Sequence, residues 1–318
     1  MPDVTIIGGG EAARSADRLL TEAGFSIHHA FQVDPHERNP AILGESGGAF
    51  ALARQLIDAG RPLLIAAPQS VTAGQLSALL GSRRARQPLF VWSERRYHAG
   101  YRLVRGLAEA DASTWWPRLI RHTYLSMEAP SAALSRWCAL ESTALVLQLS
   151  RAAALTVSAV ASENESRNAT DFLALHLQME NSAAYIQTGL GEPFDRRETV
   201  IAATGRKAWI DEVSESVPVR FLSDEDGSAS TTARQVFCPA PATGELARQQ
   251  CLAFLEASHR PALAEEEADL WSRSLAVLRA AEASLSEDGS PVEVSEANGQ
   301  AFRLILGGQT PRLRRSAG

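Results

Sequence analysis

The first 24 residues constrain the fold most, because they join a short apolar run, a glycine turn and a helical segment. Val4–Ile7 is typical of a buried β-strand, Gly8-Gly9-Gly10 interrupts it, and Ala12–Ala23 has helical spacing that ends at Gly24. Residues 8–13 fit the pattern G-x-G-x-x-A, whose glycines allow a tight turn and the close approach of a pyrophosphate. The order predicts a Rossmann-like α/β domain that binds a dinucleotide at the N-terminus of its first helix.

Further cofactor contacts are expected where the predicted strands end. A second strand, Phe25–Val33, ends at Asp34, where an acid can accept a hydrogen bond from an adenine-ribose 2′-hydroxyl and repel a 2′-phosphate. This favours NAD over NADP. Glu11 is unfavourable beside a phosphate unless its side chain points outward, so the alternative is a turn kept for packing alone, with the cofactor lost. The candidate cofactor-binding residues are Gly8, Gly10, Glu11, Ala13, Asp34, Ala67 and Pro68.

The hydrophobic pattern changes near residue 112. Before it, helical segments alternate with short apolar runs, as in a parallel α/β sheet, and residues 36–48 are polar and rich in glycine and proline. After it, longer alternating runs predict a mainly antiparallel sheet, with helical blocks at Ser131–Ala161 and Gly244–Ser286. We therefore expect a shortened Rossmann-like domain at residues 1–112 and an α+β substrate and oligomerisation domain at residues 113–318.

Composition excludes several classes of partner. With 31 basic and 37 acidic residues the net charge is −6, which disfavours nucleic acid. Cys138, Cys238 and Cys251 form no C-x-x-C spacing, which indicates a reducing compartment and neither a disulfide framework nor a cysteine zinc site. No 18-residue apolar run or export signal is present, so we expect a cytoplasmic protein that makes no membrane contact. No H-E-x-x-H or similar spacing predicts a metal site.

Taken in order, these segments and several later ones resemble the Gfo/Idh/MocA family, named for glucose-fructose oxidoreductase and inositol dehydrogenase. The matching segments are Val4–Ala13, Val33-Asp34-Pro35 (its D-P), Ile65–Pro68 (its A-T-P), Trp92–Leu107 with Arg95, Arg96 and Tyr101 (its R-R-F-x-P-x-Y), Met179–Ala183, Ile201–Asp211 and Cys251–Val294. The resemblance implies an NAD(P)(H)-dependent oxidoreductase acting on sugars, polyols or other small molecules. It also implies an open-faced antiparallel sheet through which copies of the chain form a homo-oligomer.

The departures from the family concern its acid–base residues. The A-T-P-like segment is followed by one helical segment, Thr72–Leu80, and only Gly81–Pro88 then precedes the apolar run Leu89–Trp92. The family has a further strand carrying E-K-P and a further helix there. The family's D-x-G-x-H falls on Glu141–Leu145, which keeps a carboxylate but replaces histidine by leucine. Hydride transfer needs a base or an acid beside the reacting oxygen, and the single lysine, Lys207, lies in a predicted β-turn.

Three residues are the candidate replacements. His122 and Tyr124 lie two apart on the predicted strand Arg118–Leu125, so they share one face of the sheet, and Glu141 occupies the family's aspartate position. The alternatives are a sheet face covered by a helix or a partner, and a helix-surface charge. Three functions stay open: an NAD(P)-dependent oxidoreductase on a small polar, sugar-like or specialised metabolite; a cofactor-independent lyase, cyclase or isomerase; and a non-catalytic partner subunit.

Overall fold

The structure is a computed structural model that describes residues 3–30, 32–34, 36–111, 115–164, 169–213, 219–223, 232–236 and 244–295. Cys238 lies outside these residues. The chain forms two compact units. Unit 1 contains the described residues up to Ala110 and residues 244–275, and unit 2 contains the other described residues.

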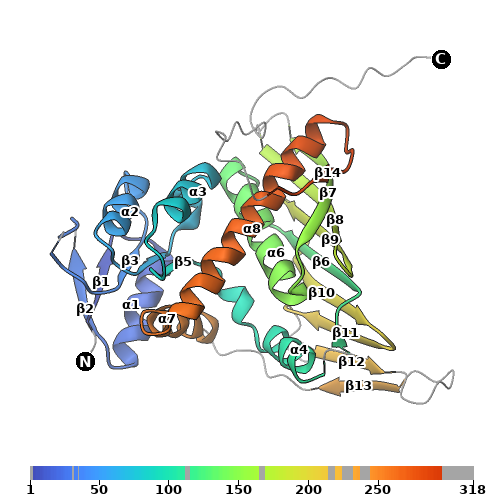
Figure 1. Cartoon of the computed structure of the whole chain (residues 1–318), viewed down its shortest axis with the longest axis horizontal. Coiled ribbons are helices and arrows are strands. Elements are labelled where there is room, and N and C mark those ends of the chain that lie inside the picture. The colour runs from blue at the N-terminus through green and yellow to red at the C-terminus, as the bar shows by residue number, and fades with distance from the viewer. Residues whose placement is uncertain are drawn as a thin grey trace. The chain divides into compact units, whose positions relative to one another are not determined.

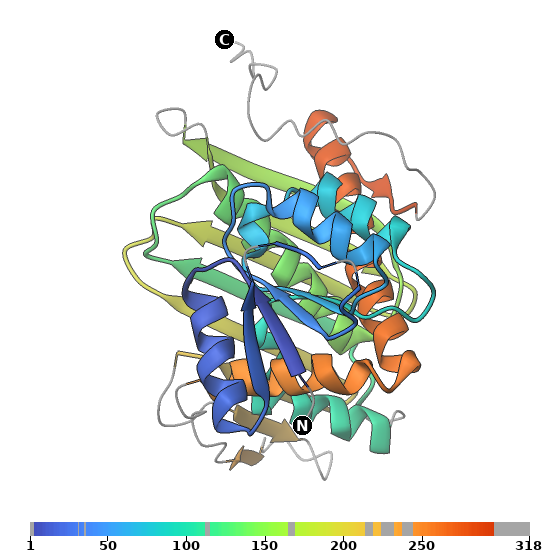
Figure 2. The ribbon, with the colours of Figure 1, turned by 90° about the vertical axis from the view of Figure 1, so that its left-hand side faces the viewer.

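Unit 1 is built on a five-stranded parallel sheet, as the sequence predicted for the N-terminal domain (Figures 1 and 2). The strand order is β2-β1-β3-β4-β5. Its elements are β1 (Asp3–Ile7), α1 (Glu11–Glu22), β2 (Ser26–Ala30), β3 (Ala41–Leu43), α2 (Ala49–Asp58), β4 (Leu63–Ile65), η1 (Pro68–Ser70), α3 (Ala73–Ser82), β5 (Leu89–Val91), η2 (Glu94–Tyr97), α4 (Ala99–Ala110), α7 (Glu245–Ala257) and the first part of α8 (Pro261–Ser286).

β3 lies in the segment that the sequence analysis described as polar and irregular. Its three residues are fully buried and pair in parallel with β1 on one side and β4 on the other. Pro40 and Gly44 bound the strand so closely that its apolar run is too short to show a period. Because β3 lies beside β1, β2 becomes an edge strand of the sheet.

The helix α7 corrects the predicted domain boundary. The sequence placed all residues after 112 in the second domain, but α7 packs on α1 within unit 1. Phe254 and Cys251 are fully buried in the same apolar cluster as Val4 and Leu20, and the Phe90 and Phe254 rings meet edge to face at 5.6 Å. Cys251 is therefore a core residue, and its burial raises the pKa of the thiol to about 12.

Unit 2 is built on a nine-stranded, mostly antiparallel sheet in the order β13-β12-β11-β10-β6-β9-β8-β7-β14, in which only the β6–β9 pair is parallel. Its elements are β6 (Leu119–Ser126), α6 (Ala132–Ser150), β7 (Ala154–Asn164), β8 (Ala169–Met179), β9 (Ala183–Leu190), β10 (Arg196–Ala203), β11 (Arg206–Asp211), β12 (Val219–Ser223), β13 (Thr232–Val236), the end of α8, and β14 (Val292–Glu293). The α/β plus α+β fold class is confirmed.

Two long helical predictions were wrong in extent. The block Ser131–Ala161 contains α6 and then β7, because Arg151 adopts a left-handed conformation with φ 54° and ends the helix. The alanine-rich sequence of β7 is compatible with the hydrophobic period of a helix as well as with that of a strand. Its pairing with β8 makes it a strand. The block Gly244–Ser286 divides into α7 and α8, with Pro261 as the first residue of α8.

The two faces of the unit 2 sheet differ. α6 contacts β6, β8 and β9 on one face, and the Ser284 hydroxyl of α8 accepts the Ala159 N–H of β7 at 3.0 Å on the same side. On the opposite face the strands expose large apolar side chains: Leu119 is 39%, Val160 64% and Tyr185 46% exposed. The Tyr185 ring stacks on His176 at 4.6 Å on this face, so His176 is a sheet-surface residue.

The last turns of α8 carry a carboxyl group that should make stability depend on pH. Burial raises the pKa of Glu282 from 4.5 to about 7, although Arg136 and Arg279 act in the opposite direction. Because the folded protein holds this proton more strongly than the unfolded chain does, protonated Glu282 contributes to the free energy of unfolding. That contribution is complete below pH 4.5 and is lost as the pH rises through about 7.

We therefore expect the free energy of unfolding of Glu282→Gln to exceed that of wild type by on the order of 1–3 kcal/mol above pH 7. Near pH 4.5 the two proteins should be about equally stable. Urea unfolding at several pH values measures this effect. Glu287→Gln, at an exposed position near the helix end, is the matched control and should follow the wild-type curve. A pH-independent effect of Glu282→Gln would contradict the account.

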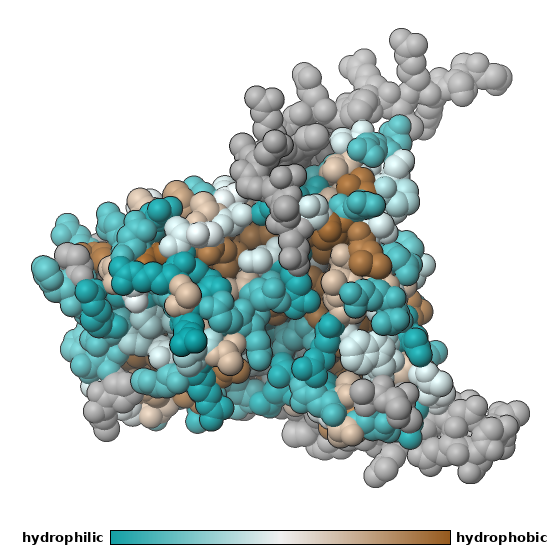
Figure 3. Space-filling model, in the orientation of Figure 1, coloured by the Kyte–Doolittle hydropathy of each residue, from teal (hydrophilic) through white to brown (hydrophobic). Residues whose placement is uncertain are grey.

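The surface shown in Figure 3 mixes hydrophilic and hydrophobic side chains, and among the described residues no helix is long and apolar enough to cross a membrane.

Candidate functional site

The glycine turn after β1 has the geometry that the sequence pattern predicted. Gly8 and Gly10 have φ of 87° and 93°, a region that disfavours any residue with a Cβ. A Cβ at Gly8 would also lie 2.7 Å from the Glu45 carbonyl oxygen. α1 begins directly after Gly10, and Ala13 is buried against the sheet. The turn therefore presents the N-terminus of α1 at the carboxyl edge of the parallel sheet.

A second segment, which the sequence analysis missed, completes the turn. The Gly9 N–H donates to the Glu45 carbonyl at 3.0 Å, the Glu45 N–H donates to the Gly9 carbonyl at 2.7 Å, and the Gly44 N–H donates to Ile7 O at 2.8 Å. A Cβ at Gly44 would lie 2.1 Å from the Gly9 oxygen and 2.8 Å from the Ala13 Cβ. The small residues of both segments thus let β1, α1 and the end of β3 meet. The only sequence signal for this close packing is Gly44 itself, which directly follows the apolar run 41–43.

The Glu45 side chain lies on the side of Gly10 where any other residue would carry its Cβ. A Cβ built there would be 2.8 Å from Glu45 Cγ and Cδ and 2.9 Å from Oε1. This is the side on which the second glycine of the pattern lets a pyrophosphate approach. Glu45 and Glu11 are both exposed. The backbone of the turn therefore fits a dinucleotide, and the Glu45 side chain lies beside the glycine at which the pattern lets the pyrophosphate approach.

Asp34 lies after β2, the strand next to β1, and its side chain is exposed. Its carboxylate accepts the His36 N–H at 2.8 Å in a local turn. The following Glu37 accepts hydrogen bonds from the Thr5 hydroxyl and, at 2.9 Å, from the fully buried Arg61 guanidinium. Burial lowers the pKa of Arg61, and the Glu37 carboxylate opposes this shift. The Glu37–Arg61 ion pair thus holds the segment that follows Asp34 against the sheet.

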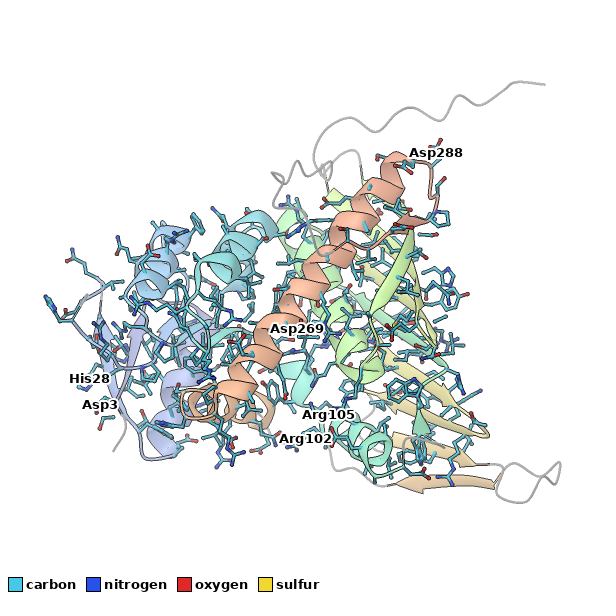
Figure 4. The ribbon with its side chains drawn as sticks, viewed as in Figure 1. Asp3, His28, Arg102, Arg105, Asp269 and Asp288 are labelled. Carbon is cyan, nitrogen blue, oxygen red and sulfur yellow. The ribbon has the colours of Figure 1, made fainter. Side chains whose placement is uncertain are left out.

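The structure exposes both histidines of β2. As β2 is an edge strand, His28 and His29 are each 59% exposed at their side chains. His28 Nε2 lies 3.7 Å from Asp3 Oδ1 (Figure 4), and His29 Nε2 lies 3.1 Å from Asp17 Oδ2. Both pairs lie at the surface, where such contacts contribute little to stability.

Ala67 and Pro68 follow β4 and are buried, with Pro68 opening the short helix η1. The strand order revises one detail of the family resemblance. Two strands, β3 and β4, each followed by a helix, precede β5 and the R-R segment. By this order β4 takes the place of the E-K-P strand, and Ala67 stands where that motif has lysine. The chain still lacks the lysine, and the shortening falls between β2 and β3.

The R-R segment contributes to the core of unit 1. Arg96 is 2% exposed; its Nη2 donates to Glu267 Oε1 at 2.5 Å, and its guanidinium lies 5.0 Å from the centre of the Trp271 ring. Trp271 Nε1 donates to the same carboxylate oxygen at 2.7 Å. His98 is buried, with its ring 5.7 Å from that of Tyr101. These side chains join η2, α4 and α8.

The structure places the candidate acid–base residues in unit 2. His122 is fully buried on β6, and its Nδ1 lies 2.8 Å from the Thr199 hydroxyl on β10. Tyr124 is 7% exposed, clusters with Cys138 of α6, and has the Arg197 guanidinium 5.2 Å from its ring centre. Both therefore lie on the sheet face that α6 covers, which is the alternative the sequence analysis left open. Glu141, on α6 itself, is 7% exposed.

Among the described residues, no group of three histidine, cysteine, aspartate or glutamate side chains could hold a metal ion.

Neither a protein-family model nor a curated protein sequence matches the chain. Solved structures do match it. UDP-N-acetylglucosamine 3-dehydrogenase GnnA from Acidithiobacillus ferrooxidans has a TM-score of 0.71 at 18% identity, over 89% of this chain and 98% of that one. A levoglucosan dehydrogenase in complex with NADH has 0.70 at 12%, over 92% and 99%. GenD2 from gentamicin A biosynthesis, in complex with NAD, has 0.68 at 12%, over 92% and 96%.

At these identities the likeness establishes the fold. Two of these similar structures are named as dehydrogenases, and two are complexes with NADH or NAD. The chain therefore has the fold of the Gfo/Idh/MocA-type dehydrogenases, as its sequence resemblance predicted.

Proposed function

We propose that the protein is an NAD-dependent oxidoreductase that acts on a sugar-like small molecule, such as an intermediate of specialised metabolism. The observation that carries the proposal is the glycine turn, with left-handed Gly8 and Gly10 at the start of α1. Exposed Asp34, four residues after the end of the neighbouring strand β2, favours NAD over NADP. The similar structures support the assignment, since two hold NADH or NAD and two are named as dehydrogenases.

In this proposal the chain's own residues bind and orient the dinucleotide. The N–H groups of the first turn of α1 hold the pyrophosphate, and the Asp34 carboxylate accepts a hydrogen bond from the ribose 2′-hydroxyl. Ala67 and Pro68 pack at the same edge of the sheet. The bound cofactor would supply or accept the hydride. Because neither Ala67 nor Leu145 can move a proton, we assign that step to Glu141 first and to Tyr124 or His122 second, or to the substrate or solvent.

A coupled assay tests this function. Purified protein is mixed with NAD or NADH and a set of sugars, keto-sugars and nucleotide sugars, and the nicotinamide absorbance is followed. Oxidation or reduction that Glu141→Gln slows without weakening NADH binding supports the proposal. Turnover of a substrate without added nicotinamide would replace it by a lyase, cyclase or isomerase. Activity that appears only in another protein's presence would replace it by a partner-subunit role.

We also propose that two copies associate through the exposed face of the unit 2 sheet, where Leu119, Val160 and Tyr185 lie. We expect light scattering to find a dimer of wild type at micromolar concentration and a monomer of Val160→Glu, because a charge in the centre of an apolar interface is costly to desolvate. Phe194→Glu, at another exposed apolar position that lies outside the strands, should leave the dimer intact. A monomeric wild type would contradict the proposal.

A further inference from the structure

We propose that Glu45 is a built-in competitor of the dinucleotide: its carboxylate takes the place of the pyrophosphate beside Gly10 and must turn away before the cofactor binds. The inference rests on the proposed function, because it concerns the same glycine turn. It goes beyond that function by assigning a residue of this chain that opposes cofactor binding.

The backbone fixes where the Glu45 side chain starts. The reciprocal hydrogen bonds with Gly9, at 3.0 and 2.7 Å, hold the Glu45 main chain. The preceding Gly44 packs so closely on Gly9 that a Cβ built on it would lie 2.1 Å from the Gly9 oxygen. The side chain therefore reaches Gly10 from a rigid base. Its carboxyl end is exposed, so rotation about its side-chain bonds can open the approach without unfolding the turn.

The local charge explains why the side chain adopts this position. Gly10 is the N-cap of α1 and has no side-chain oxygen to accept the first N–H groups of the helix. The positive end of the helix dipole favours an anion nearby, and the Glu45 carboxylate beside Gly10 supplies one.

A pyrophosphate and the Glu45 carboxylate cannot use the same space, and their like charges repel each other. Glu11, also exposed and in the first turn of this helix, adds a second negative charge. Cofactor affinity should therefore be lower than the backbone geometry alone would allow. Truncating Glu45 should raise it more than neutralising Glu11 does.

The test compares wild type, Glu45→Gln, Glu45→Ala and Glu11→Gln by calorimetric titration with NADH and with inorganic pyrophosphate at low salt. We expect the Kd of NADH to fall roughly tenfold in Glu45→Ala, and less in Glu45→Gln, which keeps the shape of the side chain but not its charge. Pyrophosphate should bind the Glu45 variants more tightly than wild type. Glu11→Gln should change either Kd by no more than about threefold.

A second readout needs no ligand. If Glu45 serves as the anion at the N-terminus of α1, Glu45→Gln should lower the Tm of the unliganded protein by about 1–3 °C. Glu22→Gln, exposed at the other end of the same helix, is the control and should not lower it.

The outcomes separate the inference from the proposed function. Tighter pyrophosphate binding by Glu45→Ala without NADH binding would support the competitor and overturn the oxidoreductase. Equal NADH binding by wild type and Glu45→Ala would overturn the competitor and leave the oxidoreductase standing. An unchanged Tm in Glu45→Gln, together with no gain in pyrophosphate affinity, would overturn the inference whatever NADH does.

Discussion

Gly44→Ala is expected to destabilise unit 1 by about 2–4 kcal/mol and to abolish NADH binding. The added methyl group would lie 2.1 Å from the Gly9 carbonyl oxygen and 2.8 Å from the Ala13 Cβ, and neither is the free end of a flexible side chain. The end of β3 must then move away from the glycine turn. That movement breaks the two hydrogen bonds between Gly9 and Glu45 and changes the turn that would hold the pyrophosphate.

Urea unfolding and NADH titration of the same preparation measure both effects. Gly47→Ala is the matched control, since a Cβ there meets no atom within 4 Å. It should unfold and bind as wild type does. Wild-type stability in Gly44→Ala would show that β3 and the glycine turn are not packed as described.

Glu267→Ala is expected to destabilise unit 1 by about 3–5 kcal/mol. The Glu267 carboxylate accepts hydrogen bonds from Arg96 at 2.5 Å and from Trp271 at 2.7 Å, and both donors belong to buried side chains. Its removal leaves a guanidinium in a site that solvent barely reaches and takes the acceptor from a buried indole N–H.

The control is the neighbouring Glu266→Ala, which removes an exposed carboxylate from the same helix and should change stability by less than about 0.5 kcal/mol. Urea midpoints of the two variants, followed by tryptophan fluorescence, give the comparison. Equal midpoints would mean that Glu267 does not compensate the Arg96 charge in the folded protein.

Much of unit 1 could be predicted because its signals are local. Gly8 and Gly10 are required by their own backbone angles, and a small residue at position 13 is required because α1 packs closely on the end of β3. All three residues therefore appear in one six-residue pattern. β3 gives no such signal, because three residues cannot display a period and only pairing with β1 and β4 identifies them as a strand.

The sequence analysis missed Gly44 and Glu45 for the same reason that it missed β3. Gly44 and Glu45 reach the glycine turn through backbone pairing across 35 residues of sequence, and no local pattern encodes that contact. The place of Ala67 likewise depends on the order of strands in the sheet. For unit 2, alternation placed His122 and Tyr124 on one face, but only the packing of Tyr124 on Cys138 shows that α6 covers it.

The most direct test of the central claim, that the glycine turn binds a nicotinamide dinucleotide, is calorimetric titration of NADH into wild type, Gly10→Ala and Gly9→Ala. A Cβ at Gly10 needs a strained φ of 93° and stands where the pyrophosphate must approach, whereas a Cβ at Gly9 meets no atom within 4 Å. The account predicts that wild type and Gly9→Ala bind NADH and that Gly10→Ala loses at least about tenfold in affinity. Equal affinities for all three proteins, or no binding to wild type and to Glu45→Ala alike, would contradict it.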